Sequence, residues 1–262
     1  PAAGRGRGRR VTLALLGTWL AAVGAGDLVR AAYDVVSPRR AAVCIAAGLG
    51  VLLAGLLLLD LDAARLVLLL VLLGSLQAVW LLGSVLAVGP DRTGPWRDRA
   101  RSLALLALGG GTVAAVLGAA LLTTEPTLPT RLAGTVLGRW PLSDVLVASG
   151  VVLAQLATAN VVVRLVLDAV GVPATSNEKQ LKGGRVLGPM ERLFIVGLGA
   201  VGELTAAAVV IAAKGLLRFP ELQRAQQRLP PAGPSDVTEY FLVGSFASWL
   251  VALGGAALIH LA

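Results

Sequence analysis

The stretch from Leu66 to Val88 contains no charged residue, and only Gly, Ser and Gln interrupt its apolar side chains. About 20 apolar residues, each rising about 1.5 Å, cross the hydrocarbon core of a bilayer, whereas apolar stretches of about 10–14 residues are typical of soluble cores. The whole chain is 56% hydrophobic, with a mean hydropathy of +0.80, well above an ordinary soluble domain. The stretch therefore predicts a transmembrane helix.

Seven apolar stretches of this kind use up most of the 262 residues, and the connections between them are too short to build a soluble core. Hydrocarbon offers backbone groups no partner, so each stretch is expected to be helical. We predict an all-α, polytopic integral membrane helix bundle with about seven transmembrane helices, or six if the first lies along the surface. The stretches are 11–32, 41–59, 66–88, 102–122, 145–170, 190–213 and 240–261.

The charge distribution predicts the domain organisation and the partners. Residues 1–10 are rich in Gly and Arg and predict a disordered basic tail, which leaves 11–262 as a single transmembrane domain. The net charge is +8, and the arginines form short clusters beside apolar stretches. This pattern favours attraction to anionic lipid headgroups over nucleic-acid binding, which needs a basic face on a folded domain. The lone Cys44 excludes an intramolecular disulfide and a cysteine-based metal site.

The stretch 190–213 and the residue that follows it hold charges, among which Arg192, Glu203 and Lys214 are equally spaced. Their equal spacing is close to three full helical turns, so one continuous helix would carry all three on nearly one face. We expect Glu203 near the middle of the membrane, and Arg192 and Lys214 near the two ends, where long side chains reach water.

A second polar stripe in the stretch 145–170 is expected to face this one. Asn160, Arg164 and Asp168 follow one another at intervals of one helical turn and therefore share a face. A carboxylate deep in a membrane needs a partner, and we expect Arg164 to pair with Glu203. The six residues Asn160, Arg164, Asp168, Arg192, Glu203 and Lys214 then form an intramembrane polar group. It is either a structural ion pair that locks two helices or a proton or ion relay.

The letters Gly197-x-Gly199-x-x-Gly202 spell a dinucleotide-binding fingerprint. That fingerprint needs a strand before it, a helix after it and further strand–helix units, and no such units follow here. We interpret the glycines as a face on which another membrane helix packs closely, and we expect no NAD binding.

Other polar residues indicate no catalytic centre. His260 is the only histidine and lies near the end of the sequence, and the carboxylates are spread thinly. We therefore assign no catalytic, metal-binding or cofactor-binding residue, and an enzyme is the less favoured reading. Gln77 and Thr112 are expected to make hydrogen bonds between helices.

Several short motifs in the C-terminal part stand at characteristic spacing. They are Gly184-Arg185, Glu191-Arg192-Leu193, Gly202, Ala206, Ile211-Ala212-Ala213-Lys214, Leu217-Arg218-Phe219 and Glu239-Tyr240-Phe241-Leu242-Val243-Gly244. Residues 155–258 with these motifs resemble the C-terminal part of an uncharacterised bacterial multi-pass membrane family, whose members have Gln where this chain has Glu203. The resemblance implies a bacterial inner-membrane protein and implies no activity. Residues 1–150 match nothing in that family.

These observations rank the functional hypotheses. The first is a transporter or channel-like protein that uses Arg164, Asp168 and Glu203. The alternative is a non-catalytic subunit or scaffold of a larger membrane complex, with a protein partner or a second copy of the chain. An enzyme acting on lipid-linked substrates is third. A sealed, fully paired arrangement of the buried charges would favour the scaffold.

Overall fold

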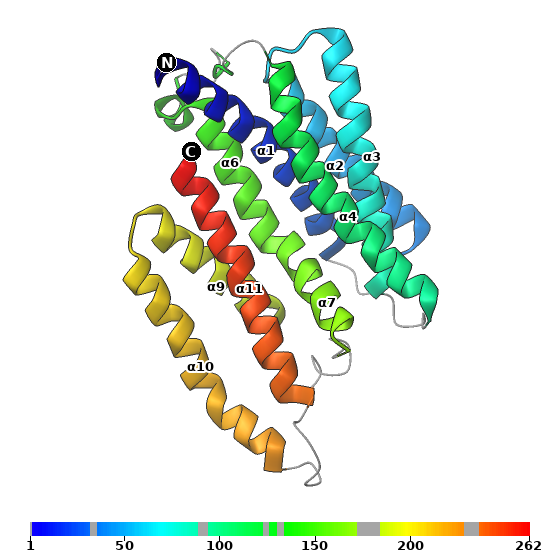
Figure 1. Ribbon diagram of the computed structural model, residues 1–262, viewed down its shortest axis with the longest axis vertical. Coiled ribbons are helices and arrows are strands. Elements are labelled where there is room, and N and C mark those ends of the chain that lie inside the picture. Colours follow the sequence, from blue (N-terminus) through cyan, green and yellow to red (C-terminus); the bar gives the residue numbers. More distant parts are fainter. Residues whose placement is uncertain are drawn as a thin grey trace. The chain divides into compact units, whose positions relative to one another are not determined.

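A computed structural model describes residues 2–31, 36–88, 94–122, 126–129, 134–171, 184–227 and 236–262. The described chain is helical and contains no strand, which confirms the predicted all-α class (Figure 1). Its helices are α1 (Ala2–Ala31), α2 (Pro38–Leu57), α3 (Ala63–Val88), α4 (Pro95–Gly118), α6 (Leu142–Leu153), α7 (Ala159–Ala169), α9 (Gly184–Ala200), α10 (Leu204–Gln227) and α11 (Asp236–Leu261). Three short helices complete them: η1 (Ala119–Leu121), η2 (Val136–Arg139) and the π-helix η3 (Ala154–Thr158).

Six helical segments among the described residues are long and apolar enough to cross a membrane. They are Gly6–Ala31, Pro38–Leu57, Ala63–Val88, Pro95–Leu121, Leu142–Ala169 and Glu239–Leu261. Large apolar side chains lie on the outside, such as Val67, Leu68 and Val71 of α3, while the polar Gln77 and Ser84 of the same helix are buried. This is the reverse of a soluble protein and suits a lipid solvent. The chain is a multi-pass membrane protein.

The described residues contain six of the seven expected spans, because residues 190–213 form two helices instead of one. Helix α9 ends at Ala200 and α10 begins at Leu204. Gly202 has a φ of +82°, the left-handed conformation that glycine adopts without steric cost. The N–H of Glu203 donates to the carbonyl of Leu198, and the N–H of Gly202 donates to that of Gly199. These two bonds form a Schellman motif, the common way for glycine to end a helix.

The alternative of six spans was predicted for a different reason, that the first helix lies along the surface. The structure instead makes α1 the most enclosed span: 78% of its most apolar window is buried, against 33–44% in the other five. Residues 2–10, predicted to be disordered, continue α1 toward its N-terminus. A helix already formed by its buried part extends cheaply, because each added residue gains a hydrogen bond without a new nucleus.

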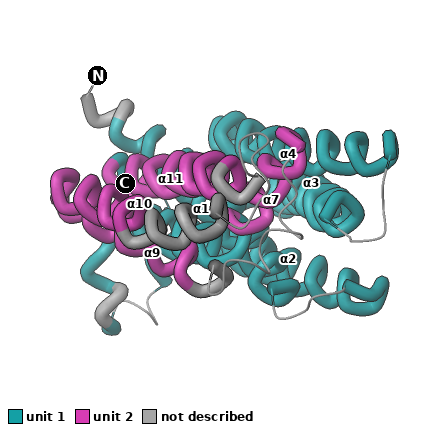
Figure 2. The backbone as a smooth tube through the Cα atoms, turned by 90° about the horizontal axis from the view of Figure 1, so that it is seen from below, with its two compact units in different colours: residues 1–158, 261–262 teal, residues 159–260 magenta. Residues whose placement is uncertain are grey.

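The chain divides into two compact units instead of the single domain expected from the sequence (Figure 2). Unit 1 comprises residues 1–158 and 261–262, and unit 2 comprises residues 159–260. Unit 2 covers nearly the same stretch as the family-like part, residues 155–258.

In unit 1, α1 packs against α2, α3, α4 and α6 through small residues. A Cβ placed on Gly17 would lie 2.5 Å from the backbone of Leu146, so α1 and α6 touch backbone to backbone. A Cβ on Gly111 of α4 would overlap the ring of Trp19, which is fully buried. Such close approach is how membrane helices gain dispersion contacts where no hydrophobic effect drives them together.

In unit 2, α9 and α10 are neighbours in space and are joined by a three-residue turn, so they form a helical hairpin. Its turn end lies beside α11, because a Cβ on Gly199 would come within 2.7 Å of the Cβ of Ala256. The close helix packing expected of these glycines is therefore confirmed at Gly199 and was wrong for Gly197 and Gly202. Gly197 and Gly202 have open space around them.

Candidate functional site

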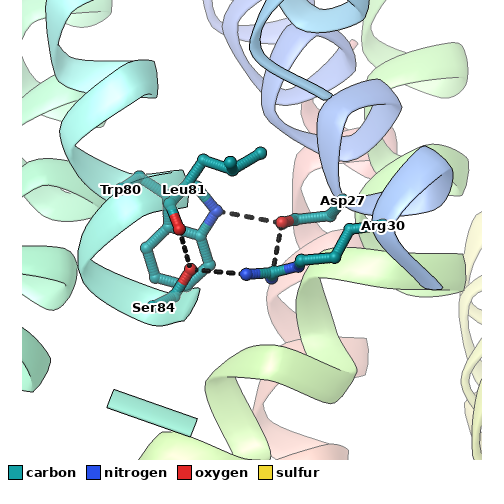
Figure 3. Close-up of polar contacts among 5 residues, drawn as sticks. All are labelled: Asp27, Arg30, Trp80, Leu81 and Ser84. Carbon is teal, nitrogen blue, oxygen red and sulfur yellow. Dashed lines mark hydrogen bonds and ion pairs between the residues drawn. The ribbon is translucent and has the colours of Figure 1, made fainter. Parts of the chain in front are cut away.

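The first buried polar cluster joins α1 to α3 in unit 1 (Figure 3). An Oδ1 of Asp27 lies 2.7 Å from an Nη2 of Arg30, one turn further along α1. The indole N–H of Trp80 donates to the other carboxylate oxygen of Asp27 at 2.9 Å. Arg30 donates to the hydroxyl of Ser84 at 2.7 Å. Trp80 and Ser84 are one turn apart on α3, so both face α1.

This unit 1 cluster is sealed from its surroundings. The side chain of Asp27 is 0% exposed and that of Arg30 is 10% exposed. The hydroxyl of Ser84 in turn donates a hydrogen bond to the carbonyl of Leu81 at 3.1 Å (Figure 3). A buried ion pair adds little net stability, but removing one partner leaves an uncompensated charge in a medium of low dielectric constant. The cluster therefore fixes how α1 and α3 fit together. The sequence patterns had not singled out Asp27 and Arg30.

The two polar residues expected to bond between helices behave differently. The indole N–H of Trp19 on α1 donates to Thr112 of α4 at 3.3 Å, which confirms the prediction for Thr112. The prediction for Gln77 was wrong within the described part of the chain: its buried amide has no hydrogen-bond partner there. Instead it packs against Gly26 and Gly48, whose missing side chains leave room for it.

The second buried polar cluster lies in unit 2 and centres on Arg192 of α9, which is 2% exposed. Its Nη2 donates to the Oδ1 of Asn160 on α7 at 2.7 Å. Its Nη1 donates to the Oγ of Ser248 on α11 at 3.1 Å. The guanidinium therefore ties three helices together through two neutral acceptors, and its planar fork of donors suits this role.

The residue before Arg192 makes an ion pair across the hairpin. The Nζ of Lys214 on α10 lies 2.6 Å from the Oε2 of Glu191 on α9. The two side chains are 15% and 13% exposed, compared with 10% for Arg30 and 0% for Asp27 in the unit 1 pair. We call Glu191, Arg192 and Lys214, together with Asn160 and Ser248, the unit 2 cluster.

The unit 2 cluster lies deep in the apolar layer. Ser248, which accepts a bond from Arg192, is about 14 Å along α11 from Glu239, where that span begins. Half of a hydrocarbon core is about 15 Å thick, so Arg192 and its neighbour Glu191 are near mid-depth. Ala256, which touches Gly199, is about 26 Å along the same span, near its other end. The turn of the hairpin therefore lies near the edge of the apolar layer.

In this geometry the depths of Glu203, Arg192 and Lys214 are the reverse of those expected from the sequence. The expectation placed Glu203 at mid-depth and Arg192 and Lys214 near the surfaces. Folding of the segment into a hairpin instead brings Arg192 and Lys214 to mid-depth and carries Glu203 to the turn. The assumption of one continuous helix was the error, because three residues on one face of a straight helix separate when the helix ends between them.

The predicted polar group is therefore brought together only in part. Asn160 and Arg192 are bonded to each other, and Lys214 lies on the same hairpin. Arg164 and Asp168 are half-buried on α7, where each has an interaction of its own. Glu203 is exposed, and its side chain makes no ion pair with any described residue, so the expected pair of Glu203 with Arg164 is not formed.

Sequence reasoning missed Glu191 and Ser248, and one signal could have found Glu191. Gly202 is the residue type that ends a helix in the left-handed conformation. A hairpin closed at Gly202 aligns residues that are about equally far from it on either side, and Glu191 and Lys214 satisfy that condition. No comparable signal marks Ser248, because serine is common in membrane helices.

The fingerprint Gly197-x-Gly199-x-x-Gly202 lies at the end of helix α9, and the described chain has no strand before it. The context that a dinucleotide site requires is therefore missing. The described residues contain no group of three or more His, Cys, Asp or Glu placed to hold a metal ion. No family model, curated protein or solved structure matches this chain.

Proposed function

We propose that this protein is a membrane carrier whose substrate or ion site is the unit 2 cluster. The observation that carries the proposal is the ion pair of Glu191 and Lys214, whose side chains are 13% and 15% exposed and which lies beside Arg192 near mid-depth. Charged groups at bilayer depth are costly and usually serve ion or substrate pathways. Carrier sites commonly lie near the midplane, where helices end or break.

The contrast between the two clusters supports this assignment. In unit 1 the ion pair is buried, and both carboxylate oxygens of Asp27 and both terminal nitrogens of Arg30 have partners, as expected of a structural lock. In unit 2 the pair joins the two helices of a hairpin, and carrier function would require these helices to move about the turn at Gly202. A substrate could replace one ion-pair partner only where the pair can be reached. This consideration favours unit 2.

A scaffold role is the second candidate, and the unit 1 cluster favours it. Its bonds hold α1 against α3, and α1 also packs on α2, α4 and α6. A membrane subunit that only binds a protein partner would need this rigidity and nothing more.

We further propose the bacterial inner membrane as the location, which the resemblance of residues 155–258 to a bacterial family supports.

Reconstitution into liposomes tests the carrier proposal. The purified chain is placed in vesicles that contain a pH-sensitive dye, and proton, chloride and phosphate gradients are imposed in turn. We expect one gradient to drive flux above that of empty vesicles. The flux should be lost in Glu191→Gln and in Lys214→Gln, while thermal unfolding in detergent should show that both variants still fold. The matched control is the exposed pair of Asp62 and Arg65 at the start of α3, tested as Asp62→Asn and Arg65→Gln.

Two results would argue against the carrier. The first is the absence of flux under every gradient while the protein is folded. The second is flux that survives both changes at Glu191 and Lys214. Either result, together with co-purification of a stable partner subunit, would favour the scaffold.

A further inference from the structure

An exposed tryptophan and an exposed arginine are stacked at the start of α4 in unit 1. Trp96 belongs to the first turn of this helix and is 75% exposed. The guanidinium of Arg99 lies over the Trp96 ring, 5.3 Å from its centroid. The face of an indole ring attracts a cation because its π electrons make that face negative. The contact therefore holds the charge of Arg99 at one place on the outside of unit 1.

The other charged residues of this turn have partners within the protein. Arg97 donates from its Nε to the carbonyl of Ala87, at the end of α3, at 2.8 Å. An Nη2 of Arg101 lies 2.9 Å from an Oδ1 of Asp98. Arg99 makes no ion pair with any described residue, so its stacking contact leaves the N–H groups for an outside acceptor. The planar fork of a guanidinium fits two oxygens of a phosphate.

The stacked pair lies at the level of lipid headgroups. Arg99 is about 6 Å along α4 from Leu103, the first exposed leucine of this span. The headgroup layer on each side of the hydrocarbon core is about 5–8 Å thick. Tryptophan is enriched at this level because its ring is apolar and its N–H is polar. The charge of Arg99 is therefore placed among the lipid phosphates.

The face of α4 that continues from Arg99 toward the membrane interior is apolar and exposed. Leu103, Leu106 and Val113 are all exposed, and their spacing places them on the face that carries Arg99. From Leu103 to Val113 this row covers about 15 Å, which is half of a hydrocarbon core of about 30 Å. A phospholipid has the same order, a phosphate followed by apolar chains that fill one leaflet. A free phosphate would use the cation alone.

We propose that Trp96 and Arg99 bind the phosphate of an anionic phospholipid, whose acyl chains lie along Leu103, Leu106 and Val113. The guanidinium donates to the phosphate oxygens, and Trp96 is the positioning residue that holds it. The first turn of a helix carries a partial positive charge, which favours an anion at this end of α4. This lipid site belongs to unit 1 and does not depend on the carrier function proposed for unit 2.

Native mass spectrometry, which counts the lipids bound to the full chain, tests the site. The chain in detergent is titrated with phosphatidylglycerol, and separately with zwitterionic phosphatidylcholine that has the same acyl chains. The unaltered chain should bind phosphatidylglycerol more tightly. Arg99→Gln should weaken that binding about fivefold, as expected for one basic residue at a membrane surface, and should weaken phosphatidylcholine binding much less. Trp96→Leu should reduce the preference for phosphatidylglycerol, whereas Trp96→Phe keeps a ring face and should retain it.

Arg139 and Trp140 supply the matched controls. Both residues are exposed, and they are neighbours in the connection before α6, but they are not stacked on each other. Arg139→Gln removes the same charge as Arg99→Gln, and Trp140→Leu removes the same ring as Trp96→Leu. Both control variants should keep the preference for phosphatidylglycerol. Thermal unfolding verifies that every variant is folded.

Two outcomes would overturn the lipid site. The first is equal affinity of the unaltered chain for the two lipids. The second is an equal loss in Arg99→Gln and Arg139→Gln, because the lipid would then respond only to the net charge of the chain. Glycerol phosphate, a soluble headgroup without acyl chains, separates a lipid from a free phosphate. It should not displace phosphatidylglycerol, and displacement at equal concentration would rule out a lipid as the occupant.

Discussion

The Nζ of Lys214 lies 2.6 Å from the Oε2 of Glu191, and this contact sets the register of the α9–α10 hairpin. Lysine and glutamate are drawn together because neither can be left alone at this depth. The same pairing leaves Arg192, next to Glu191, to donate to α7 and α11. One ion pair therefore decides which residues of α9 face which neighbours.

Replacing Asp27 by Leu should cost about 3–5 kcal/mol of unfolding free energy, because Arg30 would remain buried without its counter-charge. The double change Asp27→Leu/Arg30→Met should recover much of that loss. Unfolding in mixed micelles with increasing denaturing detergent measures both. The control is Asp98→Leu, which breaks an ion pair with Arg101 of the same residue types and spacing. Asp98 is 65% exposed, so its loss should cost less than about 1 kcal/mol. Equal losses at Asp27 and Asp98 would contradict the structural lock.

Gly111→Ala should destabilise unit 1 by about 1–3 kcal/mol, because the added methyl group collides with the ring of Trp19. Gly109→Ala on the same helix is the matched control, since no atom lies near its missing side chain. The control should be neutral or slightly stabilising, as alanine favours a helix over glycine. Thermal unfolding of the two variants side by side checks this difference. If both lose the same stability, α4 does not pack on α1 as described.

Gly202→Ala should weaken the hairpin by about 1–2 kcal/mol, because a side chain in the left-handed conformation meets its own backbone. Space is not the cause, since nothing surrounds this glycine. Gly215→Ala, in open space within helix α10, is the control and should be neutral or stabilising. Hydrogen exchange of the amides around the turn should rise only in the Gly202 variant. Unchanged exchange there would mean that the turn does not need its glycine.

NAD and NADP should give no heat of binding in calorimetry, because Gly197, Gly199 and Gly202 end a helix and cradle no phosphate. Gly199→Val should lower thermal stability by crowding Ala256 on α11, whereas Gly197→Val has open space and should lower it much less. Micromolar NAD binding that disappears in Gly199→Val would contradict the packing role.

Single cysteines should report α2, α3 and α4 as spans, because each span moves the chain to the other side of the membrane. Cysteines placed at Ser37 and Gly94 should react with an impermeant maleimide from one side. Cysteines at Ala63 and Thr127 should react from the other side only. The native Cys44 is buried in α2 and should not react with the maleimide. Labelling of the unaltered chain is the control for this. If the cysteines at Ser37 and Ala63 were labelled from the same side, α2 would not cross the membrane.

The sequence alone determined that the chain is helical and where most helices lie. Hydropathy is a local property, and hydrocarbon forces any sufficiently long apolar segment to satisfy its backbone bonds internally. Five of the six predicted stretches between 41 and 261 therefore recur as spans, close to their expected limits. The packing face at Gly199 was also visible, because absent side chains favour close helix contact.

Only the tertiary structure decided the depth and the partners of the charges. The place of α1 at the centre of unit 1 depends on close approach of Gly17 and Gly111 to distant residues, which no local pattern records. The hairpin at Gly202 moved Glu203 to the turn and brought Lys214 to Glu191. Helical periodicity predicts which residues share a face only as long as the helix continues. Where a helix ends, the partner of a charge is chosen by packing between segments, which is a property of the folded chain.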